Sequence, residues 1–263
     1  MNNQDMWSQE FAHQPSLDTQ YWNFDLGDGT NHGIPGWGNL ERESYTAENA
    51  SISGGNLQIL AQRSTEEDPA VPIYYGPRAE WLSSKITTKN KVSFKYGRLS
   101  IVAKMPKGDG TWPALWMLGT DIDTNQWPNC GEIDIFELRG DRPKNAFFTL
   151  HGPGYFGENG SGGELETSVD FTEDFHEFTI EWLPGSIEWK LDGKSQQIRK
   201  AEDVSPNAWV FDKEFYLILN LAMGGNFTGP LDENLQSAEL LIKSIVFSQI
   251  NGVGSVNLTN PTP

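Results

Sequence analysis

Apolar and polar residues alternate with a period of two over short segments of this chain, and glycine- or proline-rich turns separate those segments. In residues 97–105, every second residue from Leu99 to Met105 is apolar. The dipeptide Asp192-Gly193 between two such segments predicts a tight hairpin. No long segment has the 3.6-residue period of an amphipathic helix, and no repeat marks the blades of a β-propeller. The pattern predicts an all-β fold, either a sandwich or a barrel.

Composition excludes several kinds of partner. The chain has 263 residues, with 36 acidic and 19 basic side chains and a formal net charge of −17. Nucleic acids and anionic membrane surfaces are bound mainly by Lys and Arg, so we expect neither. The one cysteine, Cys130, excludes an internal disulfide and an all-cysteine metal site. Ten tryptophans are many for a core alone, and indole faces suit the stacking of sugar rings.

Three acids lie within six residues in a strand that is otherwise apolar. In a regular strand Glu132 and Asp134 point to one face, and Glu137 points to the other. One extra residue, a β-bulge near Ile135-Phe136, returns Glu137 to the acidic face. Crowded carboxylates raise the pKa of at least one member, as a general acid at neutral pH requires. The alternative is a solvated acidic face, which the flanking aromatic residues and glycines disfavour.

This strand resembles the signature of glycoside hydrolase family 16, in its laminarinase-like branch, where the acids are spaced Glu-x-Asp-x-x-Glu. Other blocks resemble the family in the family's order, over roughly residues 7–250; they are residues 36–41, 96–98, 110–119, 127–131, 150–154 and 219–225. The resemblance implies a jelly-roll β-sandwich of two antiparallel sheets with a concave substrate cleft. We expect one catalytic domain over residues 1–250 and a polar tail or linker remnant over residues 251–263.

The resemblance also implies a reaction. It makes this chain a retaining endo-hydrolase of β-1,3-glucan that works without a cofactor, through a covalent glycosyl-enzyme. Glu132 is then the nucleophile, Glu137 the general acid/base, and Asp134 the residue between them that tunes protonation and holds the nucleophile. A retaining mechanism requires two carboxyl groups only about 5–5.5 Å apart, and two acids on one bulged strand can be that close.

The same resemblance implies a set of sugar-binding residues, namely Asn39, Arg78, Trp112, Trp116, Trp127, His151 and Phe227. Asn39 and Arg78 match positions that bind sugar hydroxyls in the glycone half of the cleft. Phe227 stands where many relatives have Trp, so one subsite is expected to be weaker. Alternatives remain for three of them: core packing for Trp116, a structural histidine for His151 and an ordinary surface arginine for Arg78.

Metal binding is expected to be absent. The family often binds a structural calcium ion on the convex side through an Asp in the last strand, and Lys243 stands at that position here. An ammonium group cannot ligate calcium, although it can bond the same carbonyl oxygens.

We expect a monomer that acts outside the cell on a polysaccharide. Residues 1–5 contain neither a basic segment nor an apolar run, so a secretory leader is not visible in this chain.

Three alternative functions remain open. Two differ in substrate: mixed-linkage β-1,3-1,4-glucan and β-1,3-galactan. The bulged acid motif disfavours a dedicated lichenase but does not separate glucan from galactan, which depends on contacts in the loops. The third is a non-catalytic β-glucan-binding protein, and the presence of all three acids argues against it.

Overall fold

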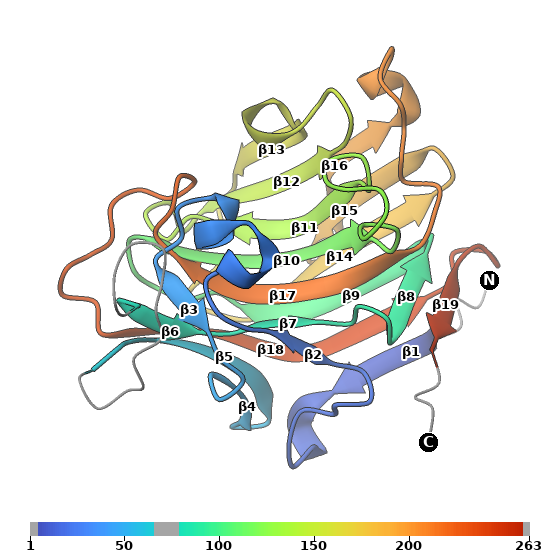
Figure 1. The fold of residues 1–263 in the computed structure, drawn as a ribbon. Coiled ribbons are helices and arrows are strands. Elements are labelled where there is room, and N and C mark those ends of the chain that lie inside the picture. The colour runs from blue at the N-terminus through green and yellow to red at the C-terminus, as the bar shows by residue number, and fades with distance from the viewer. Residues whose placement is uncertain (1–4, 66–78, 260–263) are drawn as a thin grey trace.

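Two large β-sheets lie face to face in the computed structural model, which describes residues 5–65 and 79–259 (Figure 1). In spatial order, the first sheet contains β16 (Lys194–Lys200), β15 (Ser186–Leu191), β14 (His176–Leu183), β9 (Gly97–Lys104), β18 (Ser237–Ser248), β5 (Asn56–Arg63), β6 (Trp81–Ser83) and β3 (Glu43–Tyr45). Two further strands extend it, β1 (Asp5–Glu10) beside β18 and β4 (Ala50–Ser53) beside β5.

The second sheet contains, in spatial order, β13 (Ser161–Glu166), β12 (Asn145–His151), β11 (Glu132–Leu138), β10 (Thr111–Gly119), β17 (Phe215–Met223), β7 (Lys85–Thr87) and β2 (Asn23–Asp25). At its edge, β8 (Val92–Lys95) pairs with both β17 and β19 (Ser255–Leu258). Neighbouring strands are antiparallel through the centre of both sheets, and β3 with β6 is a parallel pair. The predicted all-β sandwich of two antiparallel sheets is therefore confirmed.

Helical structure in the described part of the chain is limited to five short 3₁₀ turns: η1 (Phe11–His13), η2 (Thr30–His32), η3 (Pro35–Gly38), η4 (Gly157–Asn159) and η5 (Ala201–Val204). None of these described turns has the length and apolar character that a membrane-spanning helix requires.

The period-two segment at residues 97–105 forms β9 close to the predicted position. The predicted hairpin joins β15 to β16. Both turn residues, Asp192 and Gly193, have positive φ angles, of 49° and 73°. A two-residue hairpin with this left-handed pair matches the right-handed twist of its strands, which is why Asp-Gly is favoured there.

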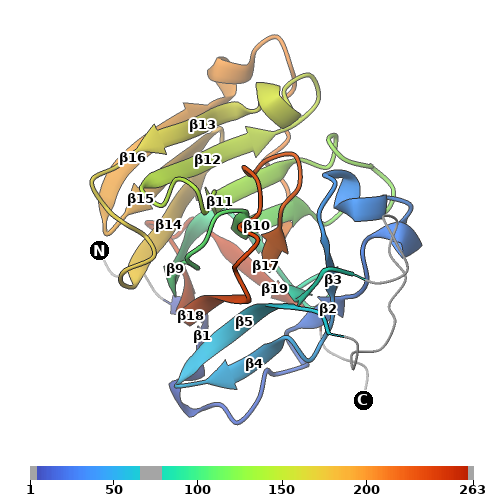
Figure 2. The ribbon, with the colours of Figure 1, turned by 90° about the vertical axis from the view of Figure 1, so that its left-hand side faces the viewer.

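The core fills the space between the two sheets. In Figures 1 and 2, β13, β12 and β11 of one sheet lie over β16, β15 and β14 of the other. Phe136 of β11 packs on Phe178 of β14 with ring centroids 4.1 Å apart, and Phe148 of β12 lies 6.4 Å from Trp189 of β15. All nine residues of β17 are buried. The apolar side chains that alternate along the strands thus meet in one continuous core, and the opposite face of the second sheet is left for the site.

The expected tail at residues 251–263 is in part a strand. A tight turn between Ile250 and Val253, closed by two backbone hydrogen bonds of 2.8 and 2.9 Å, returns the chain to the sheet. Residues Ser255–Leu258 then pair with β8 as β19. The expectation was wrong for these residues because a polar, uncharged sequence can still pair its backbone along an exposed edge. Residues 260–263 lie outside the described part.

Lys243, the residue expected to replace a calcium ligand, lies in β18 with its side chain exposed. Its ammonium group makes no hydrogen bond to a carbonyl oxygen of the described residues, so the substitute contact considered above is not formed with them.

Candidate active site

The strand with three acids contains the predicted bulge. Against β12, Glu132 pairs with His151, Asp134 with Thr149, and Glu137 with Phe147, so three steps along β11 match two along β12. The register against β10 shifts at the same place. Two residues of β11, Ile135 and Phe136, therefore face a single partner position, and both are fully buried. The bulge returns Glu137 to the face that holds Glu132 and Asp134.

Each acid has its own partner in the site, an indole N–H for two of them and an imidazole in ion-pair contact for the third. The indole Nε1 of Trp127 donates to Oε2 of Glu132, and that of Trp112 donates to Oε1 of Glu137 at 2.8 Å. Nε2 of His151 lies 3.1 Å from Oδ2 of Asp134. These partners come from β10, β12 and the loop before β11, the strand whose acids they contact. The contacts fix the carboxyl groups from several sides, which preorganises them for chemistry.

Burial and neighbouring charges shift the pKa values of the site residues. It raises the pKa of Glu137 to about 7, although the N–H of Trp112 favours the charged form. Burial, followed by the charges of Glu137 and Glu132, raises the pKa of Asp134 well above its usual range. Burial lowers the pKa of His151, but the charge of Glu132 and the contact with Asp134 outweigh it and raise it to about 10. The site thus combines a carboxyl that holds its proton near neutral pH with a protonated imidazole.

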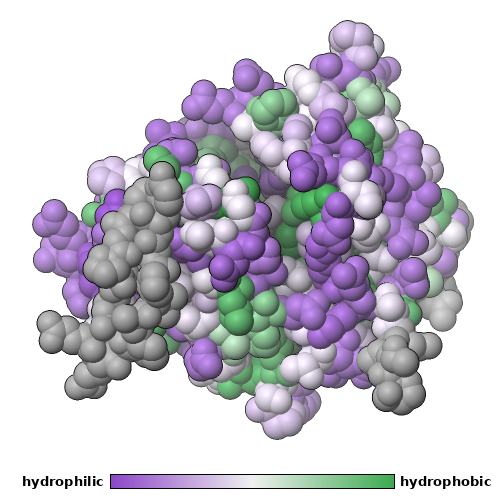
Figure 3. Space-filling model, viewed as in Figure 1, coloured by the Kyte–Doolittle hydropathy of each residue, from purple (hydrophilic) through white to green (hydrophobic). Residues whose placement is uncertain are grey.

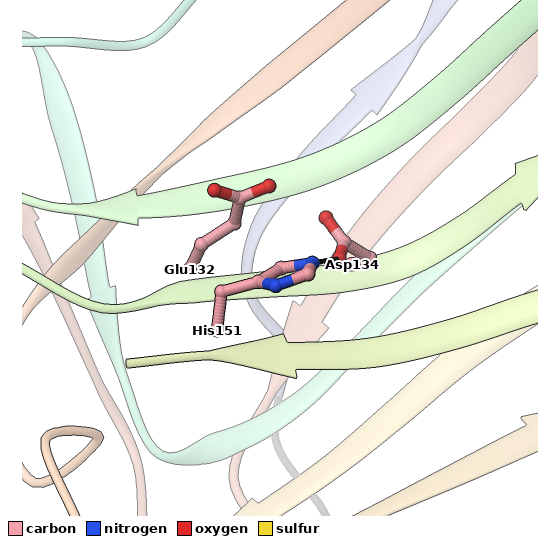
Figure 4. A group of neighbouring side chains, drawn as sticks. All are labelled: Glu132, Asp134 and His151. Carbon is pink, nitrogen blue, oxygen red and sulfur yellow. Dashed lines mark ion pairs between the residues drawn. The ribbon is translucent and has the colours of Figure 1, made fainter. Parts of the chain in front are cut away.

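Glu132, Asp134 and His151 point toward one another, with one donor atom of each within 4.8 Å of the others (Figure 4). Such a spacing can hold a metal ion. The raised pKa of His151 opposes this, because an imidazolium has no lone pair to offer a metal. The donor set therefore fits proton chemistry better than metal coordination.

Aromatic side chains line the same face. Trp112 and Trp116 lie four residues apart in β10, and both are half-buried. Phe227 packs on Trp112 with ring centroids 4.7 Å apart and on Phe147 at 4.8 Å. Over β10 and β17 the surface is hollowed, with hydrophobic side chains in its depth and hydrophilic ones around it (Figure 3). A groove with aromatic walls and acids on its floor can take a sugar chain.

Trp127 stands at the rim of the groove. Its side chain is 43% exposed and lies edge-on to Phe156, at 5.4 Å between ring centroids. Its ring also lies 6.3 Å from that of His151. Trp127 can therefore stack on a ligand and donate a hydrogen bond to Glu132 at the same time.

Of the other predicted sugar-binding residues, the structure gives contacts for Asn39 and Trp116. Asn39 follows η3 and donates from Nδ2 to Oε1 of Glu41 at 3.1 Å. Trp116 donates to Asn220 at 2.7 Å and packs against a smaller buried cluster, so it lies outside the main core between the sheets; the cluster contains Leu118, Cys130, Tyr216 and Ile218. Arg78 lies outside the described residues.

Sequence reasoning did not single out Glu41, Tyr45 or Asn220 as members of the site. All three are buried polar residues beside predicted ones. Glu41 and Asn220 lie inside the family-like blocks at residues 36–41 and 219–225, which was the available signal. Tyr45 lies in neither block, and only its tertiary contacts identify it.

The fold and the acids on one strand define a class, that of β-sandwich glycosidases with two carboxyl catalysts. The profile described as "Glycosyl hydrolases family 16" matches residues 42–230, and the chain belongs to this family. The family assignment that the resemblance suggested is therefore confirmed.

Relatives and solved structures agree with it. The glucan endo-1,3-beta-glucosidase A1 of Niallia circulans is 40% identical over 243 residues, which cover 87% of this chain and 35% of that protein. The glucan endo-1,3-beta-glucosidase of Cryptopygus antarcticus is 38% identical over 243 residues, covering 86% and 83%. The laminarinase catalytic domain of Thermotoga maritima MSB8 superposes with a TM-score of 0.88 at 42% identity, covering 95% of this chain and 99% of that one. The chain thus spans about a third of the Niallia protein and nearly all of the Thermotoga domain, so the jelly-roll fold is common to them.

Proposed function

We propose that this chain cleaves internal bonds of β-1,3-glucan of the laminarin type, with retention of configuration. The bulged strand is the observation on which the proposal rests, since it brings Glu132, Asp134 and Glu137 to one face of the sheet. The names of the Niallia and Cryptopygus relatives and of the Thermotoga domain support the substrate class. The raised pKa of Glu137 supports its assignment as the acid.

The reaction has two steps. In the first, a carboxylate oxygen of Glu132 attacks C1 of the sugar while Glu137 gives its proton to the glycosidic oxygen, so that bond breaks and a glycosyl ester forms. In the second, Glu137 takes a proton from water, the water oxygen bonds to C1, and the ester breaks. Glu132 is then free, and Glu137 has its proton again.

Asp134 and His151 act on the nucleophile without touching the bond that breaks. The imidazolium of His151 lies against Asp134, and the pair lies beside Glu132. A positive charge there stabilises the Glu132 carboxylate before attack and when it leaves the ester. Trp127 donates to the same carboxylate and holds its orientation.

The first experiment is reducing-end release on a panel of polysaccharides: laminarin, curdlan, barley mixed-linkage glucan, β-1,3-galactan and agarose. Glu132→Gln is assayed beside the wild type. We expect strong release from laminarin, lowered at least about 10³-fold in the variant because no carboxylate can form the ester. Substantial activity of Glu132→Gln would contradict the assignment of Glu132.

Retention is tested separately. With a short β-1,3-linked oligosaccharide, ¹H NMR should detect the β-anomer of the new reducing end first and the α-anomer only as mutarotation proceeds. Initial α-anomer would overturn the double-displacement mechanism.

The same panel decides among the alternatives. Reducing-end release from barley glucan or from galactan, with none from laminarin, would change the proposed substrate class and leave the roles of both glutamates as proposed. No release from any polysaccharide of the panel, with the protein folded, would indicate a binding protein or a substrate outside the panel. We also propose that the protein acts outside the cell, where it would meet such a polysaccharide.

A further inference from the structure

A chain of hydrogen bonds joins two of the proposed sugar-contacting residues through the protein interior. Nε1 of Trp116 donates to Oδ1 of Asn220 at 2.7 Å, and Nδ2 of Asn220 donates to the hydroxyl of Tyr45 at 3.1 Å. That hydroxyl donates to Oε2 of Glu41 at 3.2 Å. From the other side, Nδ2 of Asn39 donates to Oε1 of Glu41 at 3.1 Å. The chain connects the floor of the groove on β10 to the loop after η3.

The direction of every bond in this chain is fixed by chemistry. An indole N–H can only donate, so Asn220 must accept with its oxygen and donate with its nitrogen. The hydroxyl of Tyr45 receives that bond and passes its own hydrogen to Glu41. Both ends of the chain therefore point donors at Glu41, which accepts one hydrogen bond with each of its carboxyl oxygens.

Glu43, two residues on, is the buried neighbour of this carboxyl. Its side chain is fully buried, and Oε2 accepts the backbone N–H of Met223 at 2.7 Å. Oε1 is buried and has no hydrogen-bond partner among the described residues. Burial first, and then the charge of Glu41, raise the pKa of Glu43 well above its usual range. Glu43 is therefore the carboxyl of the two that favours its neutral form.

The Trp116 end of the hydrogen-bond chain is close to β11, the strand with the three acids. Trp116 pairs with Asp134 across the β10–β11 ladder, and Ala114 pairs with Glu137. On the loop side, Gly225 has a φ of +91°, and a Cβ there would lie 2.9 Å from the carbonyl oxygen of Asn39 and 3.5 Å from Trp112. The loop around Asn39 is thus packed directly against the residues that line the site.

We propose that Glu41 is a positioning residue, an acceptor of two hydrogen bonds that fixes Asn39 and Trp116 relative to each other so that both meet the same sugar chain, while Glu43 is its buried neighbour. The proposal rests on the proposed function for the identity of the ligand. Neither residue touches the bond that is cleaved.

The pair offers a matched test, because one chemical change at two neighbouring positions has opposite expected results. In Glu41→Gln the amide accepts with one atom only, so its nitrogen meets either Asn39 or Tyr45 donor to donor. In Glu43→Gln the oxygen still accepts from Met223 and the amide replaces the protonated oxygen. We expect Glu41→Gln to raise KM for β-1,3-linked oligosaccharides about threefold to tenfold with kcat within about twofold, and Glu43→Gln to match the wild type.

Tyr45→Phe gives a second route if Glu41→Gln does not fold, because it removes only the bridging hydroxyl and should also raise KM. Thermal unfolding of each variant separates this effect from loss of folded protein. Equal KM values for Glu41→Gln and Glu43→Gln, or a fall in kcat without a change in KM, would overturn the positioning role.

A readout without substrate separates this inference from the proposed function. The Trp116 indole N–H resonance of ¹⁵N-labelled protein, assigned by its loss in Trp116→Phe, should shift in Glu41→Gln and Tyr45→Phe and stay in place in Glu43→Gln. If the resonance does not shift in Glu41→Gln and Tyr45→Phe, the hydrogen-bond chain is refuted. If it shifts as expected while no β-glucan is cleaved, the chain stands and the proposed function fails.

Discussion

At the scale of single residues, Glu137 shows how burial can set the protonation state that its proposed role as an acid requires. Its pKa of about 7 is the result of burial, opposed by the N–H of Trp112. An acid must be protonated to act, so kcat/KM on laminarin should fall about tenfold per pH unit above pH 7. A pH–rate profile of the wild type measures this limb.

Glu137→Ala is the control for that assignment. Aryl β-glycosides with good leaving groups need little protonation, so the variant should lose far less activity on them than on laminarin, and the limb near pH 7 should disappear. A limb that survives in Glu137→Ala would assign the titration to another group.

Trp127 makes a second prediction at this scale. Its indole donates to Glu132, and removing a hydrogen bond to a charged group costs more than removing a neutral one. Trp127→Phe keeps an aromatic face but loses the donor, so we expect kcat/KM to fall about tenfold. Trp209→Phe is the matched control, because Trp209 also donates to a carboxylate, that of Asp212, in a different loop. Equal losses in the two variants would contradict the role of Trp127.

At the scale of elements, the acid strand was readable from its own residues. Glu132, Asp134 and Glu137 break the period of two by one position, and a single bulge at Ile135-Phe136 is the smallest change that restores a common face. The contacts of Asn220 were not readable. Its neighbours Ala114 and Lys85 come from strands distant in sequence, and their register is set by tertiary pairing.

Phe136 links the bulge to the core and gives the prediction for this scale. Its ring packs against those of Phe148, Phe171 and Phe178, at 6.1, 4.9 and 4.1 Å between centroids. Phe136→Ala should lower the free energy of unfolding by about 3–5 kcal/mol, because it leaves a cavity beneath Glu137. Urea denaturation measures the loss, and a change below about 1 kcal/mol would mean that the bulge is held by other contacts.

At the scale of the whole molecule, alternation and turns predicted an all-β fold because they are local signals, and the resemblance to the family implied the two-sheet sandwich. The closing of the second sheet by β19 was missed because an edge pairs through the backbone and leaves little trace in side chains. The acids of β11, Glu132, Asp134 and Glu137, were singled out because their spacing along one apolar strand is a local signal. Glu43 was not, because its burial depends on how β3 meets the end of β17.

The buried acids and His151 together give the molecule an unusual dependence of stability on pH. Glu43, Asp134 and Glu137 have raised pKa values, so the folded state binds more protons than the unfolded chain between pH 4.5 and their folded values. Their contribution is full below about pH 4.5 and is lost as the pH rises, which for Glu137 alone, from 4.5 to about 7, corresponds to about 3 kcal/mol. His151 acts in the same direction, with a contribution that is full below 6.5 and lost as the pH rises through about 10.

We therefore expect the free energy of unfolding to fall steadily from pH 5 to pH 9. Carboxylates with lowered pKa values oppose this trend only in more acidic solution, below their usual pKa; they are Asp121, Asp170 and Glu181. Urea denaturation at pH 5, 7 and 9 measures the slope for the wild type and for Glu43→Gln. The amide cannot ionise, so the variant should lose less stability over this range than the wild type does. Parallel curves for the two proteins would show that Glu43 is ionised in the fold, and its description as a neutral buried carboxyl would then be wrong.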